Sequence, residues 1–192
     1  MTTHSSIESE SSNDEQLEQK LILTAIEELP YRTEAYSSLM KLYEKRIYWM
    51  CHRIICDDSE AHDATQEVLI RVFHHLPKFK AESSFKTWLY AIARNVSLTM
   101  LSKTKNSKAN LPIEDKHEQD HKNAYNPNAV TDHALDIDKA FAKLDINNRE
   151  ILSLKFVGNL SVSEIAEALD IKLSAAKMRL SRATEELRKL IE

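Results

Sequence analysis

A basic and aromatic stripe runs along the segment FKTWLYAIARN, residues 85–95. Lys86, Tyr90 and Arg94 recur at every fourth residue, a spacing that places them on one face of a helix. Two cations with an aromatic ring between them could bind phosphates and stack with unpaired bases. The same spacing also fits the ordinary solvated face of an amphipathic helix. Taken alone, the segment leaves both interpretations open.

A second candidate for nucleic-acid binding lies near the C-terminus, in residues 160–190. Ser161 and Glu164 have the S-x-x-E spacing of a capping box, which predicts the start of a short helix. A tight turn at 170–172 then leads to a second helix, for which Ser174 is the predicted cap. The outward positions of this second helix are basic: Lys177, Arg179 and Arg182. The arrangement predicts a helix-turn-helix whose second helix enters a major groove, with an ordinary charged helical hairpin as the alternative.

Metal and catalytic sites are harder to build from this sequence. Cys51 and Cys56 are five residues apart, about 140° around a helix, which is unsuited to joint ligation of a metal. His117 and His121 share an i, i+4 spacing but have no convincing third ligand. The clustered carboxylates that a nuclease needs are also lacking. We therefore expect no enzyme activity, no metal and no cofactor.

Helices are the elements that must position these residues, and the composition favours them. The chain has one glycine and four prolines, and strand-like runs of alternating β-branched residues are absent. We expect a disordered tail over 1–13, a helical domain over 14–103, a linker over 104–132 and a second helical domain over 133–192. The predicted fold class is all-α, with two small helical domains joined by a flexible polar linker.

Charge is unevenly distributed along a chain whose net charge is −4. Residues 1–29 hold seven acids against Lys20, whereas residues 71–108 hold eight basic residues against Glu82. A local charge of +7 within an acidic protein indicates a surface for a polyanion. No segment approaches the roughly 20 apolar residues of a membrane span, and no apolar signal-peptide core lies near the start. We therefore expect no membrane insertion and a cytoplasmic location.

The C-terminal segment NREILSLKFVGNLSVSEIAEALDIKLSAAKMRLSRATEELRKL resembles region 4 of bacterial sigma factors, in particular those of the extracytoplasmic-function (ECF) group. In that family this helix-turn-helix recognises the minus-35 promoter element. The resemblance implies DNA contacts from Ser174, Ala175, Lys177, Met178, Arg179 and Arg182. Two departures from the family pattern stand out. The usual turn glycine is Asp170 here, and the usual Gly-Thr-Val is Ser174-Ala175-Ala176, so promoter preference cannot be transferred.

The segment HDATQEVLIRVFHHLPKF resembles region 2.2 of the same family, which docks on the clamp of the RNA polymerase beta-prime subunit. The resemblance implies polymerase contacts from Asp63, Gln66, Glu67 and Ile70. The acid that usually precedes Asp63 is His62 here, which weakens the expected charge pairing. We hypothesise that a phosphate on Thr65 supplies the missing negative charge.

The segment FKAESSFKTWLYAIARN, residues 79–95, resembles regions 2.3 and 2.4, which open the minus-10 element and capture a flipped base. The resemblance implies minus-10 DNA contacts from Lys80, Ser83, Ser84, Lys86, Trp88, Tyr90, Arg94 and Asn95. Within this set, Trp88 is expected to pack inward and support the others. The resemblance therefore favours the DNA-binding interpretation of the basic and aromatic stripe.

The two resemblances cover about residues 14–103 and 134–192, in the order that the family shows. They imply an ECF-type sigma factor that binds core RNA polymerase, through the beta-prime clamp helices and the beta flap, and directs initiation at promoter DNA. Family members are commonly held by an anti-sigma factor, so such a protein or another regulator of unknown identity is an expected partner. The alternative is a stand-alone helix-turn-helix regulator, which would bind its operator without polymerase.

Overall fold

The computed structural model describes the backbone of residues 4–109 and 132–191 and the side chains of residues 16–104 and 137–191. The helices are α1 (His4–Glu28), α2 (Glu34–Ile55), α3 (Asp58–His75), the short 3-10 helix η1 (Leu76–Lys78), α4 (Phe85–Ala109), α5 (Asp132–Lys143), α6 (Ile146–Phe156), α7 (Val162–Ala168) and α8 (Leu173–Ile191). The described residues contain no strand, which confirms the predicted all-α class.

The N-terminal domain consists of α1 to α4, and α2 is its central helix, in contact with the other three. Every third or fourth residue of α2 is buried, so the helix presents an apolar stripe to its neighbours. The side chain of Asp57 caps α3 by accepting a hydrogen bond from the Glu60 amide at 2.9 Å. Pro77 ends α3 in η1, because proline cannot continue the hydrogen-bond ladder of an α-helix.

Two helices extend beyond the limits expected from the sequence. The helix α1 begins at His4, whereas the sequence predicted a disordered tail over 1–13. The helix α4 continues to Ala109, six residues past the expected end at Lys103. Adding a turn to an existing helix is far easier than nucleating one, so polar residues without a clear apolar period still extend it. The remainder of the predicted linker, residues 110–131, lies outside the described residues, as do His117 and His121.

The C-terminal domain consists of α5 to α8. The predicted capping box at the start of α7 is present: the Ser161 hydroxyl accepts from the Glu164 amide, and the Glu164 carboxylate accepts from the Ser161 amide. Asp170, in the turn before α8, has a φ of 51°, the left-handed conformation that glycine adopts in the family pattern. The helix α8 begins at Leu173, two residues earlier than a cap at Ser174 predicts, so Ser174 lies within the first turn and is not the cap.

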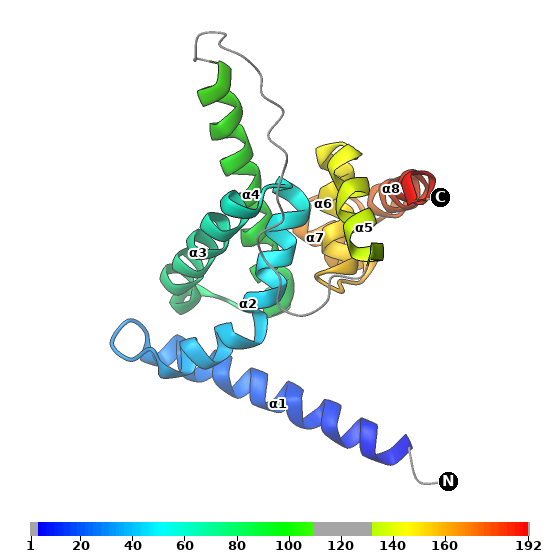
Figure 1. The fold of residues 1–192 in the computed structure, drawn as a ribbon. Coiled ribbons are helices and arrows are strands. Elements are labelled where there is room, and N and C mark those ends of the chain that lie inside the picture. Colours follow the sequence, from blue (N-terminus) through cyan, green and yellow to red (C-terminus); the bar gives the residue numbers. More distant parts are fainter. Residues whose placement is uncertain (1–3, 110–131, 192) are drawn as a thin grey trace.

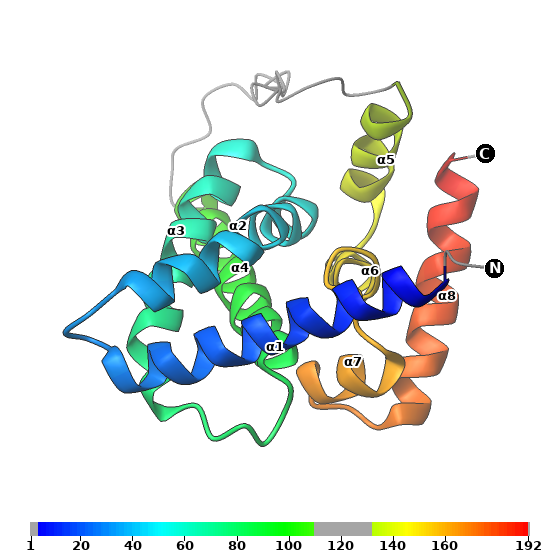
Figure 2. The ribbon, with the colours of Figure 1, turned by 90° about the horizontal axis from the view of Figure 1, so that it is seen from below.

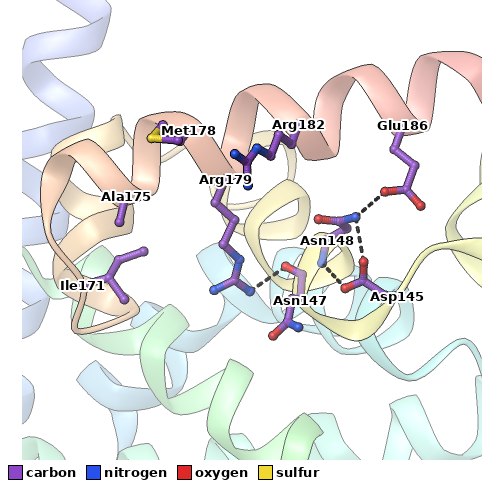
Figure 3. A pocket seen from close by; sticks show the side chains of 9 residues that line it. All are labelled: Asp145, Asn147, Asn148, Ile171, Ala175, Met178, Arg179, Arg182 and Glu186. Atoms are coloured by element: carbon purple, nitrogen blue, oxygen red, sulfur yellow. Dashed lines mark hydrogen bonds between the residues drawn. The ribbon is translucent and has the colours of Figure 1, made fainter.

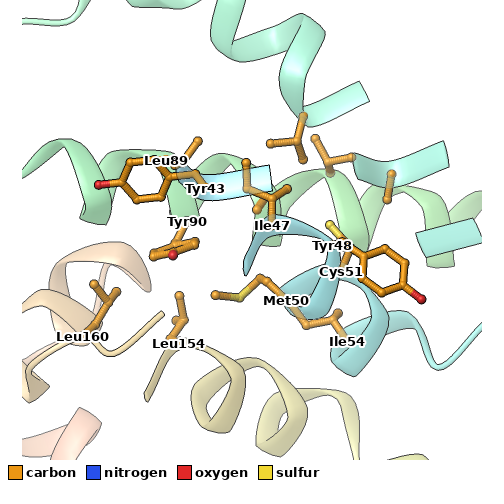
Figure 4. Packing of buried hydrophobic residues seen from close by; sticks show 14 of the residues in the cluster. Tyr43, Ile47, Tyr48, Met50, Cys51, Ile54, Leu89, Tyr90, Leu154 and Leu160 are labelled. Carbon is orange, nitrogen blue, oxygen red and sulfur yellow. The ribbon is translucent and has the colours of Figure 1, made fainter. Parts of the chain in front are cut away.

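The two domains pack directly against each other (Figures 1 and 2). The helices α6 and α7 lie between α8 on one side and α2 and α4 on the other. Figure 4 shows Tyr90 and Met50 of the N-terminal domain facing Leu154 and Leu160 of the C-terminal domain. All four side chains are completely buried in one apolar cluster that spans both domains. The described residues of the two domains therefore share one hydrophobic core.

Gly158 lies where the two domains come closest. A Cβ atom at this position would lie 3.1 Å from Cδ2 of Tyr90, 3.3 Å from Cε of Met50 and 2.7 Å from the carbonyl oxygen of Leu154. The sequence therefore places its one glycine at the point where the turn after α6 presses against α2 and α4.

Candidate nucleic-acid interface

The helix α4 carries the basic and aromatic stripe, but the stripe faces the C-terminal domain. Lys86 Nζ donates a hydrogen bond to the carbonyl oxygen of Asn159 at 3.2 Å. The hydroxyl groups of Ser84 and Thr87 both donate to Oε1 of Glu164, at 3.1 and 3.3 Å. We refer to Ser84, Lys86, Thr87, Tyr90 and Arg94 together as the docked face. Three of these five residues thus form hydrogen bonds with Asn159, before α7, or with Glu164, in its first turn.

Tyr90, at the centre of the docked face, has no exposed surface. Its ring lies 6.3 Å from that of Tyr43 in an edge-on arrangement, and its other side meets Gly158. Burial raises the pKa of the Tyr90 hydroxyl to about 12. The expectation that Tyr90 presents its ring to DNA does not hold in this conformation, because the C-terminal domain covers it.

Glu150 of α6 joins the docked face to the helix-turn-helix. Its Oε2 atom accepts hydrogen bonds from Nε and Nη2 of Arg94, both at 3.2 Å, and from Nη2 of Arg179 at 3.1 Å. The carboxylate side chain is only 4% exposed. A buried carboxylate is stable only when its charge is compensated, and here two guanidinium groups compensate it.

The remaining residues of the predicted minus-10 set surround the docked face. Trp88 is half-buried and lies in an aromatic cluster with Phe79 and Phe85, at ring-centroid distances of 5.0 and 5.8 Å. Its inward packing agrees with the expected supporting role. The rest of the set lies on the loop before α4 or farther along the helix: Lys80 and Asn95 are exposed, and Ser83 is half-buried.

The helix α8 presents an exposed surface on the side away from the N-terminal domain. Ala176 and Ala183 are fully buried against the rest of the domain, as the apolar spacing predicts. The predicted minus-35 residues that lie exposed are Ser174, Ala175, Lys177, Met178 and Arg182. Figure 3 shows a groove between this helix and the start of α6, and Arg182 and Met178 lie along it. The arrangement offers cations and a flexible apolar side chain to a ligand that approaches α8.

Arg179 differs from the rest of the predicted minus-35 set. It was expected to point outward, but its guanidinium group turns back to α6, where it donates to the carbonyl oxygen of Asn147 at 2.6 Å (Figure 3). It also donates to the carboxylate of Glu150. The attraction of the buried carboxylate explains the difference, because a charged partner within reach outweighs the preference for solvent. In this conformation Arg179 positions α8 against α6.

The predicted polymerase-binding residues share the outer face of α3, and this face is open. Asp63 and Gln66 are exposed, and 53% of the Ile70 surface is accessible. Glu67 forms an ion pair with Arg71 one turn later, at 2.6 Å between Oε1 and Nε. The structure therefore brings these four residues together on one accessible surface of acid, amide and apolar groups.

His62 and Thr65 lie on the side of α3 that meets α2. The imidazole of His62 lies 4.7 Å from the ring of Tyr48, at the edge of a groove that Trp49 also lines. Thr65 is buried, and its hydroxyl donates to the carbonyl oxygen of Ala61 at 2.7 Å. The hypothesis of a phosphate on Thr65 is therefore not supported, since a kinase cannot reach this hydroxyl in the folded helix.

The described residues offer neither a metal site nor a helix that could span a membrane. Cys51 is fully buried, and burial raises the pKa of its thiol to about 11. Across the side chains that the structure describes, no three histidine, cysteine or acidic side chains gather into a metal site. None of the described helices is long and apolar enough to cross a membrane.

Two residues that determine this geometry were not singled out from the sequence. In the sequence, Glu150 stands out only as part of the family motif, and Asn159 belongs to no predicted set. A signal for Glu150 exists, because it lies among the fully buried residues Ile151, Leu152 and Leu154 of α6. A carboxylate inside an apolar run predicts a buried cationic partner. Asn159 acts through its backbone carbonyl, which no sequence pattern reveals.

Comparison with known protein families matches both domains of the chain. Residues 39–107 match the model of Sigma-70 region 2, and residues 134–187 match the model of Sigma-70, region 4. The ECF RNA polymerase sigma factor SigW of Bacillus subtilis is 30% identical over 169 residues, which cover 81% of this chain and 88% of SigW. The sigma factor SigX of the same organism is 29% identical, with 83% of this chain and 84% of SigX covered.

Two solved structures share the fold at low sequence identity. CnrH, in complex with the cytosolic domain of CnrY, has a TM-score of 0.64 at 17% identity, with 91% of this chain and 97% of the other covered. The sigma factor RpoE of Bartonella quintana, in complex with the anti-sigma factor NepR, has a TM-score of 0.64 at 21% identity, with coverage of 83% and 98%. Both sigma-70 regions occur in order, and SigW is matched over most of its length at 30% identity, so this chain belongs to the ECF group of RNA polymerase sigma factors.

Proposed function

We propose that this sigma factor binds core RNA polymerase through the outer face of α3 and directs promoter-specific transcription initiation. The observation that carries the proposal is the accessibility of Asp63, Gln66 and Ile70 on one face. Acidic and amide groups around an apolar side chain suit a basic partner surface with an apolar centre. The beta-prime clamp helices are the proposed partner there, and the beta flap is the proposed partner of the C-terminal domain.

In this proposal the C-terminal domain recognises the minus-35 element. The helix α8 enters the major groove of intact duplex, where Lys177 and Arg182 approach phosphates or base edges and Met178 makes an apolar contact. The exposure of these three side chains supports this role. Arg179 supports the helix from behind through Asn147 and Glu150.

The N-terminal domain recognises and melts the minus-10 element. Lys86 and Arg94 provide cations for the DNA backbone, and Trp88 in its aromatic cluster supports the platform on which an unpaired base is held. Each base that stacks on an aromatic ring contributes about 1–3 kcal/mol, and phosphate contacts add affinity that falls as salt rises. The chain forms and breaks no covalent bond itself, so we propose that it is not an enzyme and that the polymerase performs the chemistry.

A regulatory protein partner is a further part of this proposal. Both solved structures described above are complexes with a second protein. CnrH is bound to the cytosolic domain of CnrY, and RpoE is bound to the anti-sigma factor NepR. By analogy, we propose that an anti-sigma factor or a similar regulator binds this chain. The cytoplasm, where RNA polymerase acts, is the proposed location.

Run-off transcription with purified core polymerase on a genomic promoter library tests the proposed function. The wild-type chain should produce specific start sites. The double variant Gln66→Ala/Glu67→Lys should lose them, because it removes an amide and reverses a charge on the polymerase-binding face. The expected loss of transcript is about 30-fold or more, since charge reversal in an interface typically costs 2 kcal/mol or more.

The matched control is Gln19→Ala/Glu27→Lys, which makes the same chemical changes at exposed positions of α1. This control should transcribe as the wild type does. Equal activity of the α3 variant and its control would contradict the proposal that the outer face of α3 binds polymerase. A chain that ignores polymerase but binds duplex DNA tightly would instead identify a stand-alone regulator.

A further inference from the structure

Part of the surface proposed to meet the minus-10 element lies against the C-terminal domain, whereas Lys80 and Asn95 of the same set remain exposed. Ser84, Lys86 and Arg94 each form a hydrogen bond with that domain, and Tyr90 is buried against it. These groups cannot contact the domain and a DNA strand at the same time. From this overlap we propose that the free chain is autoinhibited: the C-terminal domain docks on the N-terminal domain and blocks minus-10 DNA.

The docked arrangement is held by apolar packing at its centre. Tyr90 and Met50 meet Leu154 and Leu160 in the shared core, and Gly158 permits the close approach (Figure 4). Burial of large apolar side chains stabilises such a contact by roughly 25 cal/mol per Å² of surface removed from water. The packing makes closure favourable, but it does not select one orientation of the domains.

Three sets of polar contacts fix the orientation. Glu150 binds Arg94 at one end of the docked face, and Glu164 binds the hydroxyl groups of Ser84 and Thr87 at the other. These two carboxylates occupy positions where DNA phosphates would be bound, because hydroxyl and guanidinium groups are ordinary phosphate ligands. In this sense the C-terminal domain presents two negative charges in place of a DNA backbone.

The third polar contact lies away from the docked face. Asp138 of α5 forms an ion pair with Arg53 of α2, at 2.5 Å between Oδ1 and Nη1, and the Arg53 guanidinium also lies 4.8 Å from the ring centroid of Phe141. Neither Asp138 nor Arg53 belongs to the proposed polymerase-binding or DNA-binding residues. The pair can therefore be broken to open the molecule without changing any group proposed to contact DNA.

The polymerase-binding face remains accessible in the closed molecule, because α3 lies on the other side of the N-terminal domain from α6 and α7 (Figure 2). This separation suggests an order of events. The closed chain can meet core polymerase first, and the docked face becomes available only when the C-terminal domain moves away. Autoinhibition of this kind would keep the free sigma factor off DNA while leaving it competent to bind polymerase.

The test combines a distance measurement with a DNA-binding measurement on the full chain. Spin labels on His74→Cys in α3 and Thr184→Cys in α8, both exposed positions, report the domain separation by pulsed electron paramagnetic resonance. Cys56→Ser removes the half-buried native thiol, and Cys51 is fully buried. Fluorescence anisotropy with a mixed-sequence single-stranded DNA, without polymerase, reports access to the docked face.

The variants Asp138→Asn and Glu150→Gln should each add a long-distance population that the wild type lacks. With fewer than about one wild-type molecule in ten open, full opening should strengthen DNA binding at least about tenfold. The control Glu167→Gln removes the same charge at an exposed position of α7 and should change neither measurement. Circular dichroism checks that Glu150→Gln folds. If Glu150→Gln does not fold, Asp138→Asn alone tests whether opening strengthens DNA binding.

The outcomes separate this inference from the proposed function on which it rests. A wild type that is already open, or variants that leave the distances unchanged, would overturn the closed state. Variants that open without any gain in DNA binding would overturn autoinhibition by showing that the docked face does not bind DNA, which would also remove that part of the proposed function. Loss of transcription in the α3 variant is independent of both results.

Discussion

The two predicted binding faces of the N-terminal domain differ in accessibility. The outer face of α3 is open, with Asp63, Gln66 and Ile70 in contact with solvent. The docked face lies against the C-terminal domain: Tyr90 and Thr87 are buried, and the other three residues form hydrogen bonds with that domain although Ser84 is itself exposed. The comparison indicates that the same fold can display one interaction surface while its own C-terminal domain lies over another.

The largest expected contrast is in stability. Tyr90→Ala should reduce the free energy of unfolding by about 3–5 kcal/mol, because it leaves a large cavity in the shared core. Ile70→Ala, on the open face, should change it by no more than about 0.5 kcal/mol. Urea unfolding followed by circular dichroism measures both. Similar small losses for the two variants would mean that the docked face is not part of the core.

A second contrast is in thiol reactivity. In a Cys56→Ser background, a cysteine introduced by Gln66→Cys should react freely with a thiol reagent. A cysteine introduced by Thr87→Cys should react at least about 100-fold more slowly, because Thr87 is 2% exposed. The remaining native thiol, Cys51, is buried and has a pKa of about 11, so it contributes little. Adding Asp138→Asn should bring the reaction rates of the two cysteines closer together, because it opens the molecule. Equal rates without that substitution would contradict the covered state.

The smallest expected effect is the pH dependence of the docked face. Burial alone would raise the pKa of Glu164, but hydrogen bonds from the amide and hydroxyl of Ser161 and from Ser84 outweigh it and lower the pKa below its usual value. The carboxylate therefore contributes stability above its unfolded-state pKa, and this contribution is lost as the pH falls through the lower folded-state pKa. The contribution should be below about 1 kcal/mol, because solvent still screens this half-buried group at the surface.

The Tm difference between the wild type and Glu164→Gln, at neutral and acidic pH, measures this effect. The difference should be largest near neutral pH and should shrink in acid. Glu185→Gln is the control, because Glu185 pairs with Lys189 on the exposed side of α8, away from the docked face. If the Tm difference between the wild type and Glu164→Gln were the same in acid as at neutral pH, the charge of Glu164 would have no part in its contact with the docked face.

Local features of the fold could be predicted from the sequence. The capping box of Ser161 and Glu164 predicts the start of α7, and Asp170 takes the place of a turn glycine in a left-handed conformation. The inward side of α8 and the half-buried Trp88 also follow from helical spacing. These features depend on neighbours within a few residues, which is the range over which a sequence pattern carries information.

The docking of the two domains could not be predicted in this way. The periodicity of α4 shows only one apolar side, so the sequence predicts that Tyr90 and Arg94 face outward. The second buried side of α4 is formed by contact with the C-terminal domain, which is distant in the sequence. Arg179 was assigned to DNA for the same reason, since its partner Glu150 is 29 residues away. Contacts that form between charged residues of different helices leave no period in the sequence.

The shared core has a consequence for the synthesis of this protein. The N-terminal half leaves the ribosome first, with Met50 and Tyr90 still lacking the side chains that cover them in the finished molecule. At roughly 5–20 residues per second, the rest of the chain follows several seconds later. During that interval the nascent chain exposes an aggregation-prone apolar surface, to which a chaperone at the ribosome exit can bind.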